Sequence, residues 1–120
     1  MYATEIKVNG KTIPIRFGVY VIKKLADDGI RLQGLDELIK NNYADIISRI
    51  IYYGAVNASE ERRGDNVSLN DIYDWIDDVS DGLFGEEVSK IYNLFAQQLN
   101  DSVPKNSKAG KASPQKKANG

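Results

Sequence analysis

Asn9 and Gly10, near the start of the chain, decide how its first 17 residues can fold. Both residue types tolerate a positive φ, which the two central positions of a type I′ turn require, so the pair predicts a β-hairpin with a two-residue loop. With that loop, Ile6 faces Ile13 across the strands. One face of the hairpin is then mostly apolar, and the other carries four polar side chains: Glu5, Lys7, Thr12 and Arg16. Because loop and alternation select the same register, the sequence specifies one hairpin.

Apolar residues at helical spacing follow the hairpin. We expect helices over residues 19–28, 35–40, 43–57, from 69 onward, and from 86 to about 100. The 43–57 helix has the broadest apolar surface, so we expect it to be the central and most buried helix. Gly54 within it predicts a close approach by another helix, since an interior glycine costs about 1 kcal/mol relative to alanine.

Capping residues mark the ends of these helices. Ser68, with Asp71 three residues later, is a variant of the capping box. The helix that it starts is expected to bury five apolar side chains: Leu69, Ile72, Trp75, Ile76 and Val79. Glu86 and Glu87 suit the positive start of the last helix. The expected fold class is α+β, mostly α, with an N-terminal β-hairpin packed on a bundle of about four or five helices.

Residues 1–101 are expected to form one folded domain, and residues 102–120 a disordered, basic C-terminal tail. The tail is rich in Lys, Ser and Ala and has no apolar periodicity. It holds five of the 16 basic residues and no acidic one, which leaves 11 basic against 17 acidic residues in the domain. The domain core is predicted to include eight side chains: Ile6, Ile13, Ile15, Leu25, Ile50, Trp75, Ile76 and Phe95.

The composition argues against an enzyme. The chain has no cysteine and no histidine, so it lacks thiolate chemistry, the commonest general base and the commonest transition-metal ligand. The segment Gly82–Gly85 lacks the Lys and Ser/Thr of a phosphate loop. We therefore expect no catalytic residue and no cofactor.

Four aspartates recur on one helical face: Asp71, Asp74, Asp78 and Asp81. They admit two interpretations, a cation site or a solvated face opposite the apolar stripe. Hard cations need oxygens that converge from different segments, which favours the solvated face. No metal site is therefore expected.

The best candidates for contact with a partner are the adjacent tyrosines Tyr52 and Tyr53. Successive helical positions differ by about 100°, so we expect one ring to point away from the helix's core stripe. Core packing against the hairpin is the simpler interpretation, and contact with a partner is the alternative to it. Because the apolar surface of the 43–57 helix is wider than one stripe needs, self-association and binding of an extended helical partner are expected there.

The sequence also predicts where the chain acts. It begins directly with a strand pattern, without the apolar core of a signal peptide, and no apolar run approaches transmembrane length. We expect a soluble, cytoplasmic protein without a membrane partner. The lysine tail could contact phosphate, but it has no aromatic or Arg side chain for discrimination, and the acidic domain argues against a nucleic-acid surface. No specific nucleic-acid partner is expected, and the tail suits solubilisation or tethering.

Taken in order, several segments resemble the tail assembly chaperones of long-tailed bacteriophages. These segments are Arg16–Leu25, Asp28–Ile30, Tyr52–Ala55 and Ser68–Ile76. In that family a short β-hairpin precedes a helical bundle, and a Phe-Gly helix start, a small-residue segment in a central helix and a late helix with Asp-Trp recur. The resemblance covers about residues 3–100, and the order of the motifs carries it more than any single motif.

The resemblance implies a non-enzymatic role in virion assembly. Such chaperones keep the tape measure protein, an extended and largely helical polypeptide, soluble while tail tube subunits assemble around it, and they are absent from the mature virion. The implied partners are the tape measure protein, the tail tube protein and further copies of the chain, in the bacterial host cytoplasm. Members often have a longer, frameshifted form, for which this tail would suit a connector. The alternatives are a small DNA-associated regulatory protein that uses its basic tail, and a structural tail-completion or tube-adaptor protein.

Overall fold

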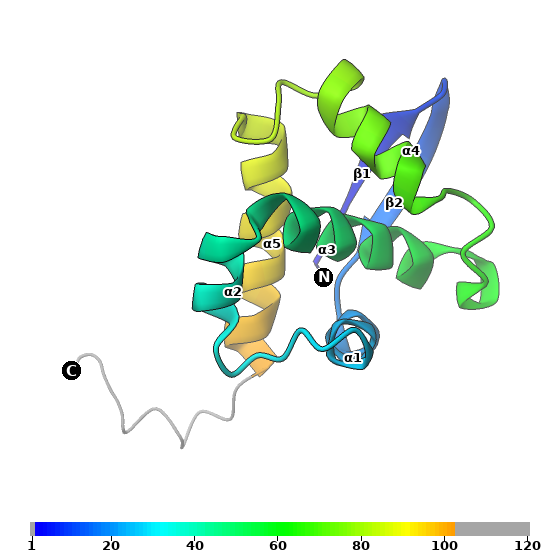
Figure 1. The fold of residues 1–120 in the computed structure, drawn as a ribbon. Coiled ribbons are helices and arrows are strands. Elements are labelled where there is room, and N and C mark those ends of the chain that lie inside the picture. The colour runs from blue at the N-terminus through cyan, green and yellow to red at the C-terminus, as the bar shows by residue number, and fades with distance from the viewer. Residues whose placement is uncertain (1, 103–120) are drawn as a thin grey trace.

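The computed structural model describes residues 2–102. The predicted disordered tail falls outside them, apart from Ser102, which ends the last helix. In chain order the elements are β1 (Ala3–Val8), β2 (Lys11–Arg16), α1 (Val19–Asp27), α2 (Leu35–Asn41), α3 (Tyr43–Ala58), η1 (Glu60–Arg62), α4 (Leu69–Asp74), η2 (Trp75–Val79) and α5 (Glu86–Ser102) (Figure 1). A two-stranded antiparallel hairpin thus precedes five α-helices, which confirms the predicted fold class.

The hairpin has the register that the sequence predicts. Ile6 pairs with Ile13, and the turn residues Asn9 and Gly10 have φ values of 53° and 79°. These are the positive values that a type I′ turn requires. The apolar face of the hairpin is buried through Ile6, Val8, Ile13, Ile15 and Phe17. The hairpin is therefore one wall of the core.

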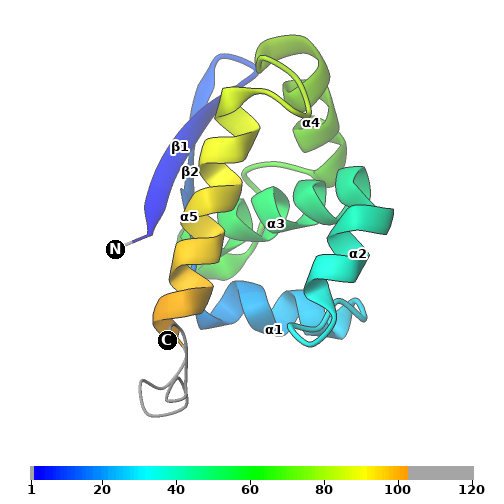
Figure 2. The same ribbon diagram turned by 90° about the vertical axis from the view of Figure 1, so that its left-hand side faces the viewer.

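Helix α3 is the central element, as predicted. It contacts β2, α1, α2, α4 and α5, and nine of its residues are buried. Figure 1 shows it crossing the middle of the molecule, with α1 on one side and α4 on the other. Helix α5 runs alongside the hairpin (Figure 2). There the ring of Phe95 meets that of Phe17 edge-on, with 5.5 Å between their centroids.

The close approach expected at Gly54 is made by strand β2, and the prediction of another helix was wrong. A Cβ atom at Gly54 would lie 2.6 Å from Cγ2 of Ile15 and 2.8 Å from Cε1 of Phe17. The reason is that the hairpin lays its apolar face directly on α3. Ile15 of β2 and Phe17, directly after the strand, fill the space that the glycine leaves.

The apolar stripe predicted after Ser68 is correct only in its middle. Ile72, Trp75 and Ile76 are buried, but Leu69 is half-buried and Val79 is 55% exposed. The cause at Val79 is η2, a π-helical turn in which the N–H of Ser80 donates to the carbonyl of Trp75, five residues earlier, at 2.8 Å. A π-turn winds the chain less per residue than an α-helix does, so the end of the stripe moves out of the core.

All eight side chains predicted for the core are buried, and Ile50 is fully so. We expect Ile50→Ala to lower the free energy of unfolding by about 2–5 kcal/mol, because the lost methyl groups leave a cavity at the centre of the bundle. Urea denaturation of the wild type and the variant measures this difference. A loss below about 1 kcal/mol would show that Ile50 does not pack as described.

Gly54→Ala should also destabilise the domain. The added methyl group would overlap Ile15 and Phe17, and overpacking of this kind costs about 1–3 kcal/mol. This cost is expected to exceed the gain of about 1 kcal/mol in helix propensity. Gly18→Ala is the matched control, since its Cβ atom would come no closer than 3.9 Å to a neighbour. If Gly54→Ala raised the unfolding midpoint, the tight contact with β2 would be refuted.

Candidate functional site

The predicted partner residues Tyr52 and Tyr53 share one hollow. Both are half-buried, and their ring centroids are 5.3 Å apart with planes inclined at 54°. The expectation that the two rings would diverge was therefore wrong, because two long side chains can meet over the groove between α1 and α3. The hollow has a volume of about 330 Å³. We call it the tyrosine pocket and define it by six of its lining residues: Tyr20, Lys24, Tyr52, Tyr53, Arg62 and Arg63.

Of the two tyrosine hydroxyls, that of Tyr53 is hydrogen-bonded within the described residues and that of Tyr52 is not. The Tyr53 hydroxyl donates to the Asp28 carboxylate at 2.5 Å, and Arg49 binds the same carboxylate at 3.1 Å. Burial and the Asp28 carboxylate raise the pKa of Tyr53 to about 12, so its hydroxyl stays a neutral donor. Tyr53 thereby anchors the end of α1 to α3. No residue of the described span hydrogen-bonds the Tyr52 hydroxyl, which leaves it available to a partner.

Arg62 lines the tyrosine pocket, and contacts with Tyr20 and Asn57 restrain its side chain. Its guanidinium lies 4.9 Å from the centroid of the Tyr20 ring, a cation–π distance, and its Nε donates to Oδ1 of Asn57 at 2.9 Å. Asn57 is buried, and its Nδ2 donates to the carbonyl of Arg16 at 2.8 Å. Glu61 and Arg62 have φ values of 53° and 55°. Such left-handed backbone costs a non-glycine residue about 1–3 kcal/mol, so the surrounding contacts must hold the turn in place.

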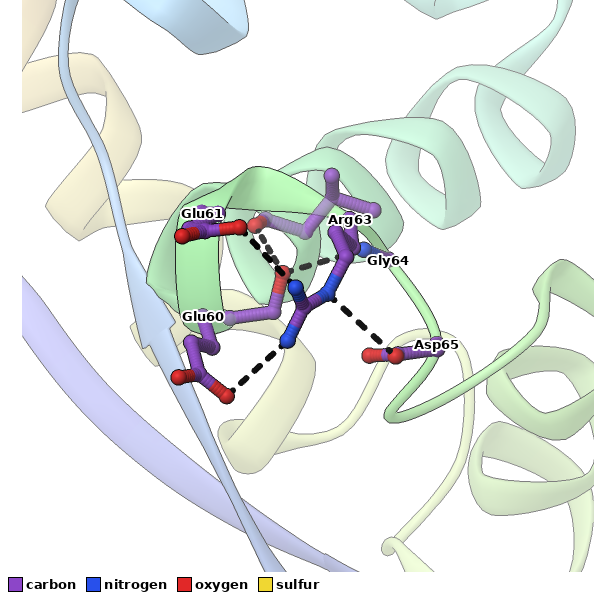
Figure 3. Close-up of polar contacts among 7 residues, drawn as sticks. Glu60, Glu61, Arg63, Gly64 and Asp65 are labelled. Carbon is purple, nitrogen blue, oxygen red and sulfur yellow. Dashed lines mark hydrogen bonds and ion pairs between the residues drawn. The ribbon is translucent and has the colours of Figure 1, made fainter.

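Arg63 is neutralised by its own loop, as Figure 3 shows. Its guanidinium nitrogens lie 3.0, 2.9 and 3.7 Å from carboxylate oxygens of Glu60, Glu61 and Asp65. Lys24 and Arg62 differ from it: within residues 2–102 neither has an acidic side chain at ion-pair distance. The tyrosine pocket thus has two cations without an ion-pair partner among residues 2–102, in a domain with an excess of acidic residues.

A second surface, which the sequence analysis missed, centres on Phe84. This side chain is 82% exposed, and its ring stacks on Tyr43 with 5.1 Å between centroids and 11° between planes. The Tyr43 hydroxyl donates to the carbonyl of Leu83 at 3.3 Å. Beside it, a hollow of about 360 Å³ lies between the start of α3 and the α4–η2 segment. We call this surface the Phe84 patch: Tyr43, Tyr73, Ile76, Leu83 and Phe84.

The signal for this patch was present in the sequence. Leu83 and Phe84 stand between Gly82 and Gly85 in the connection from η2 to α5. Connections between elements run over the surface, so two adjacent apolar residues in one cannot both be covered. Leu83 is half-buried and Phe84 is exposed. An aromatic residue between two glycines was therefore a candidate contact residue.

The four aspartates proposed as a solvated face have separate roles. Asp71 and Ser68 form the predicted capping box. Asp81 accepts the backbone N–H groups of Glu86 at 2.8 Å and Glu87 at 3.1 Å, and so caps α5. Asp74 and Asp78 are exposed. Between residues 2 and 102 no group of three or more His, Cys, Asp or Glu residues is placed to hold a metal ion.

In the same part of the chain, no helix is long and apolar enough to cross a membrane. Comparisons with protein-family models, with curated proteins and with solved structures found no match to this chain. Its function is therefore argued from the tyrosine pocket, the Phe84 patch and the resemblance carried by the sequence segments.

The cap formed by Asp81 predicts a pH-dependent effect on stability. The N–H groups of Glu87 and Glu86 hold the pKa of Asp81 below its ordinary value of 3.8. The charged cap therefore stabilises the fold fully above that value, and its contribution is lost as the pH falls through the lower folded-state pKa. Asp81→Ala should lower the melting temperature at neutral pH, and the difference from the wild type should shrink in acid. Circular dichroism measures both.

Asp78→Ala is the control for this experiment, because Asp78 is exposed and makes no hydrogen bond or ion pair within the described residues. It should leave the melting temperature unchanged at neutral pH. An equal effect of the two substitutions would mean that general charge, and not the cap, is responsible.

Proposed function

We propose that the protein is a tail assembly chaperone of a long-tailed bacteriophage. In this role it keeps the tape measure protein soluble, recruits tail tube subunits in the host cytoplasm, and is absent from the mature virion. The observation that carries the proposal is the Phe84 patch. A large aromatic side chain that is 82% exposed beside a hollow between helices is typical of a contact surface.

The geometry of the patch suits an amphipathic helix. Helical partners place apolar anchors three and four residues apart into grooves between helices. The hollow between α3 and α4–η2 has room for one or two such anchors, and Phe84 offers a further aromatic contact at its edge. The tape measure protein, which the resemblance supplies as the client, is extended and largely helical.

The charge of the domain suits a holding role. Its 17 acidic residues against 11 basic ones keep copies apart by repulsion while the patch stays exposed. No nucleophile–base pair or cofactor enters this role. A holding chaperone needs a binding surface and solubility. We assign contact with the client to the Phe84 patch. Further contacts, with tube subunits or other copies, are assigned to the surface around Tyr52 and Tyr53.

Co-expression tests the proposal. The tape measure protein of the same phage should remain in the soluble fraction with the full-length chain and sediment without it. Phe84→Ser should reduce the soluble tape measure protein several-fold, because it removes the exposed anchor. Its effect on the unfolding free energy should stay within about 1.5 kcal/mol, because Phe84 is outside the core and loses only its stacking on Tyr43.

Leu32→Ser is the matched control, because Leu32 is also an exposed apolar residue, at 49%, but lies in the α1–α2 connection. It should leave client solubility unchanged. If the wild type fails to keep the tape measure protein soluble, the chaperone proposal is wrong. If mass spectrometry finds the chain in purified virions, the structural tail-completion alternative replaces it.

A further inference from the structure

We propose that the tyrosine pocket binds a carboxylate side chain on an acidic segment of a protein partner. This deepens the proposed function, on which the partner's identity rests, but the chemistry of the pocket stands on its own residues. Lys24 and Arg62 face the pocket without an acidic neighbour at ion-pair distance in residues 2–102. An anion in the pocket would therefore meet two cations that have no ion-pair partner among those residues, beside a loop in which Glu60, Glu61 and Asp65 surround Arg63.

Arg62 is prepared to receive a carboxylate. Its Nε is occupied by Asn57, and its guanidinium lies over the ring of Tyr20. The two Nη groups remain, and they form the fork that binds a carboxylate through two parallel hydrogen bonds. The hydrogen bond to Asn57 and the contact with the Tyr20 ring restrain this side chain, so less freedom is lost when the anion arrives.

The walls of the pocket favour an amino-acid side chain over a bare anion. The rings of Tyr20 and Tyr52 line the pocket next to the cations, and the Tyr52 hydroxyl is an additional donor. A glutamate has methylene groups that can pack on those rings while its carboxylate reaches Arg62. Phosphate has no such groups. Tyrosine and arginine together are also the residues most enriched at the centres of protein interfaces.

Charge decides between the other possible occupants. The chain's own segment 103–120 carries five lysines and no acid, so it does not complement the pocket. A nucleic acid would have to approach a domain with six more acidic than basic residues, 17 against 11, and would be repelled. An acidic protein segment needs to place only one or two carboxylates at the pocket.

The test uses the full-length chain and a fluorescent helical peptide of about 20 residues that carries two Glu residues and no other charge, with its Glu→Gln counterpart as the neutral probe. Fluorescence anisotropy should show binding of the Glu peptide that weakens with added salt, and binding of the Gln peptide at least about tenfold weaker. Lys24→Gln with Arg62→Gln should weaken binding of the Glu peptide by at least about tenfold. Arg31→Gln, which removes an exposed cation outside the pocket, should not.

Three results would overturn the carboxylate site, and a fourth would separate it from the proposed function. Equal binding of the two peptides, or no effect of the double substitution at an unchanged melting temperature, removes the carboxylate site. Competition by inorganic phosphate at the same concentration as the Glu peptide assigns a simple anion site instead. If sedimentation shows a dimer that the double substitution dissociates, the pocket binds a second copy of the chain instead. If the wild type binds the Glu peptide but does not keep the tape measure protein soluble, the proposed function is refuted and the carboxylate site stands.

Discussion

The contact between Gly54 and strand β2 is the constraint on which the rest of the fold depends. A two-stranded hairpin is at best marginally stable alone and needs a helix against its apolar face. The missing side chain at Gly54 lets Ile15 and Phe17 reach the surface of α3, and the ring of Phe95 from α5 then closes over Phe17. Hairpin and helical bundle share one core for this reason. A larger residue at position 54 would separate them.

The same contact supports the tyrosine pocket. Asn57 lies three residues after Gly54 on α3, and it joins the end of β2, through the carbonyl of Arg16, to the side chain of Arg62. The strained turn that presents Arg62 is thus tied to the place where strand and helix are closest. The Phe84 patch has a different support, the stacked ring of Tyr43 at the start of α3. Helix α3 therefore carries both the core contact at Gly54 and residues of the two surfaces.

Local chemistry could be predicted from the sequence, and contacts between distant segments could not. The hairpin register follows from Asn9 and Gly10, and the start of α4 from Ser68, because a turn or cap is decided by its own residues. The neighbour of Gly54 could not be identified, since a small residue signals proximity without saying to what. The π-turn at η2 and the cap from Asp81 to α5 depend on how α4 and α5 are placed. The convergence of Tyr52 with Tyr53 likewise required the position of α1.

The two surfaces open on opposite sides of α3. The hollow of the Phe84 patch lies between α3 and α4–η2, whereas the tyrosine pocket lies between α3 and α1. Figures 1 and 2 both place α1 and α4 on opposite sides of that helix. A single straight helical partner cannot occupy both. One surface is apolar and the other cationic, so the two select different chemistry. A chaperone that holds one client while recruiting another needs this separation, since binding at the first surface then leaves the second free.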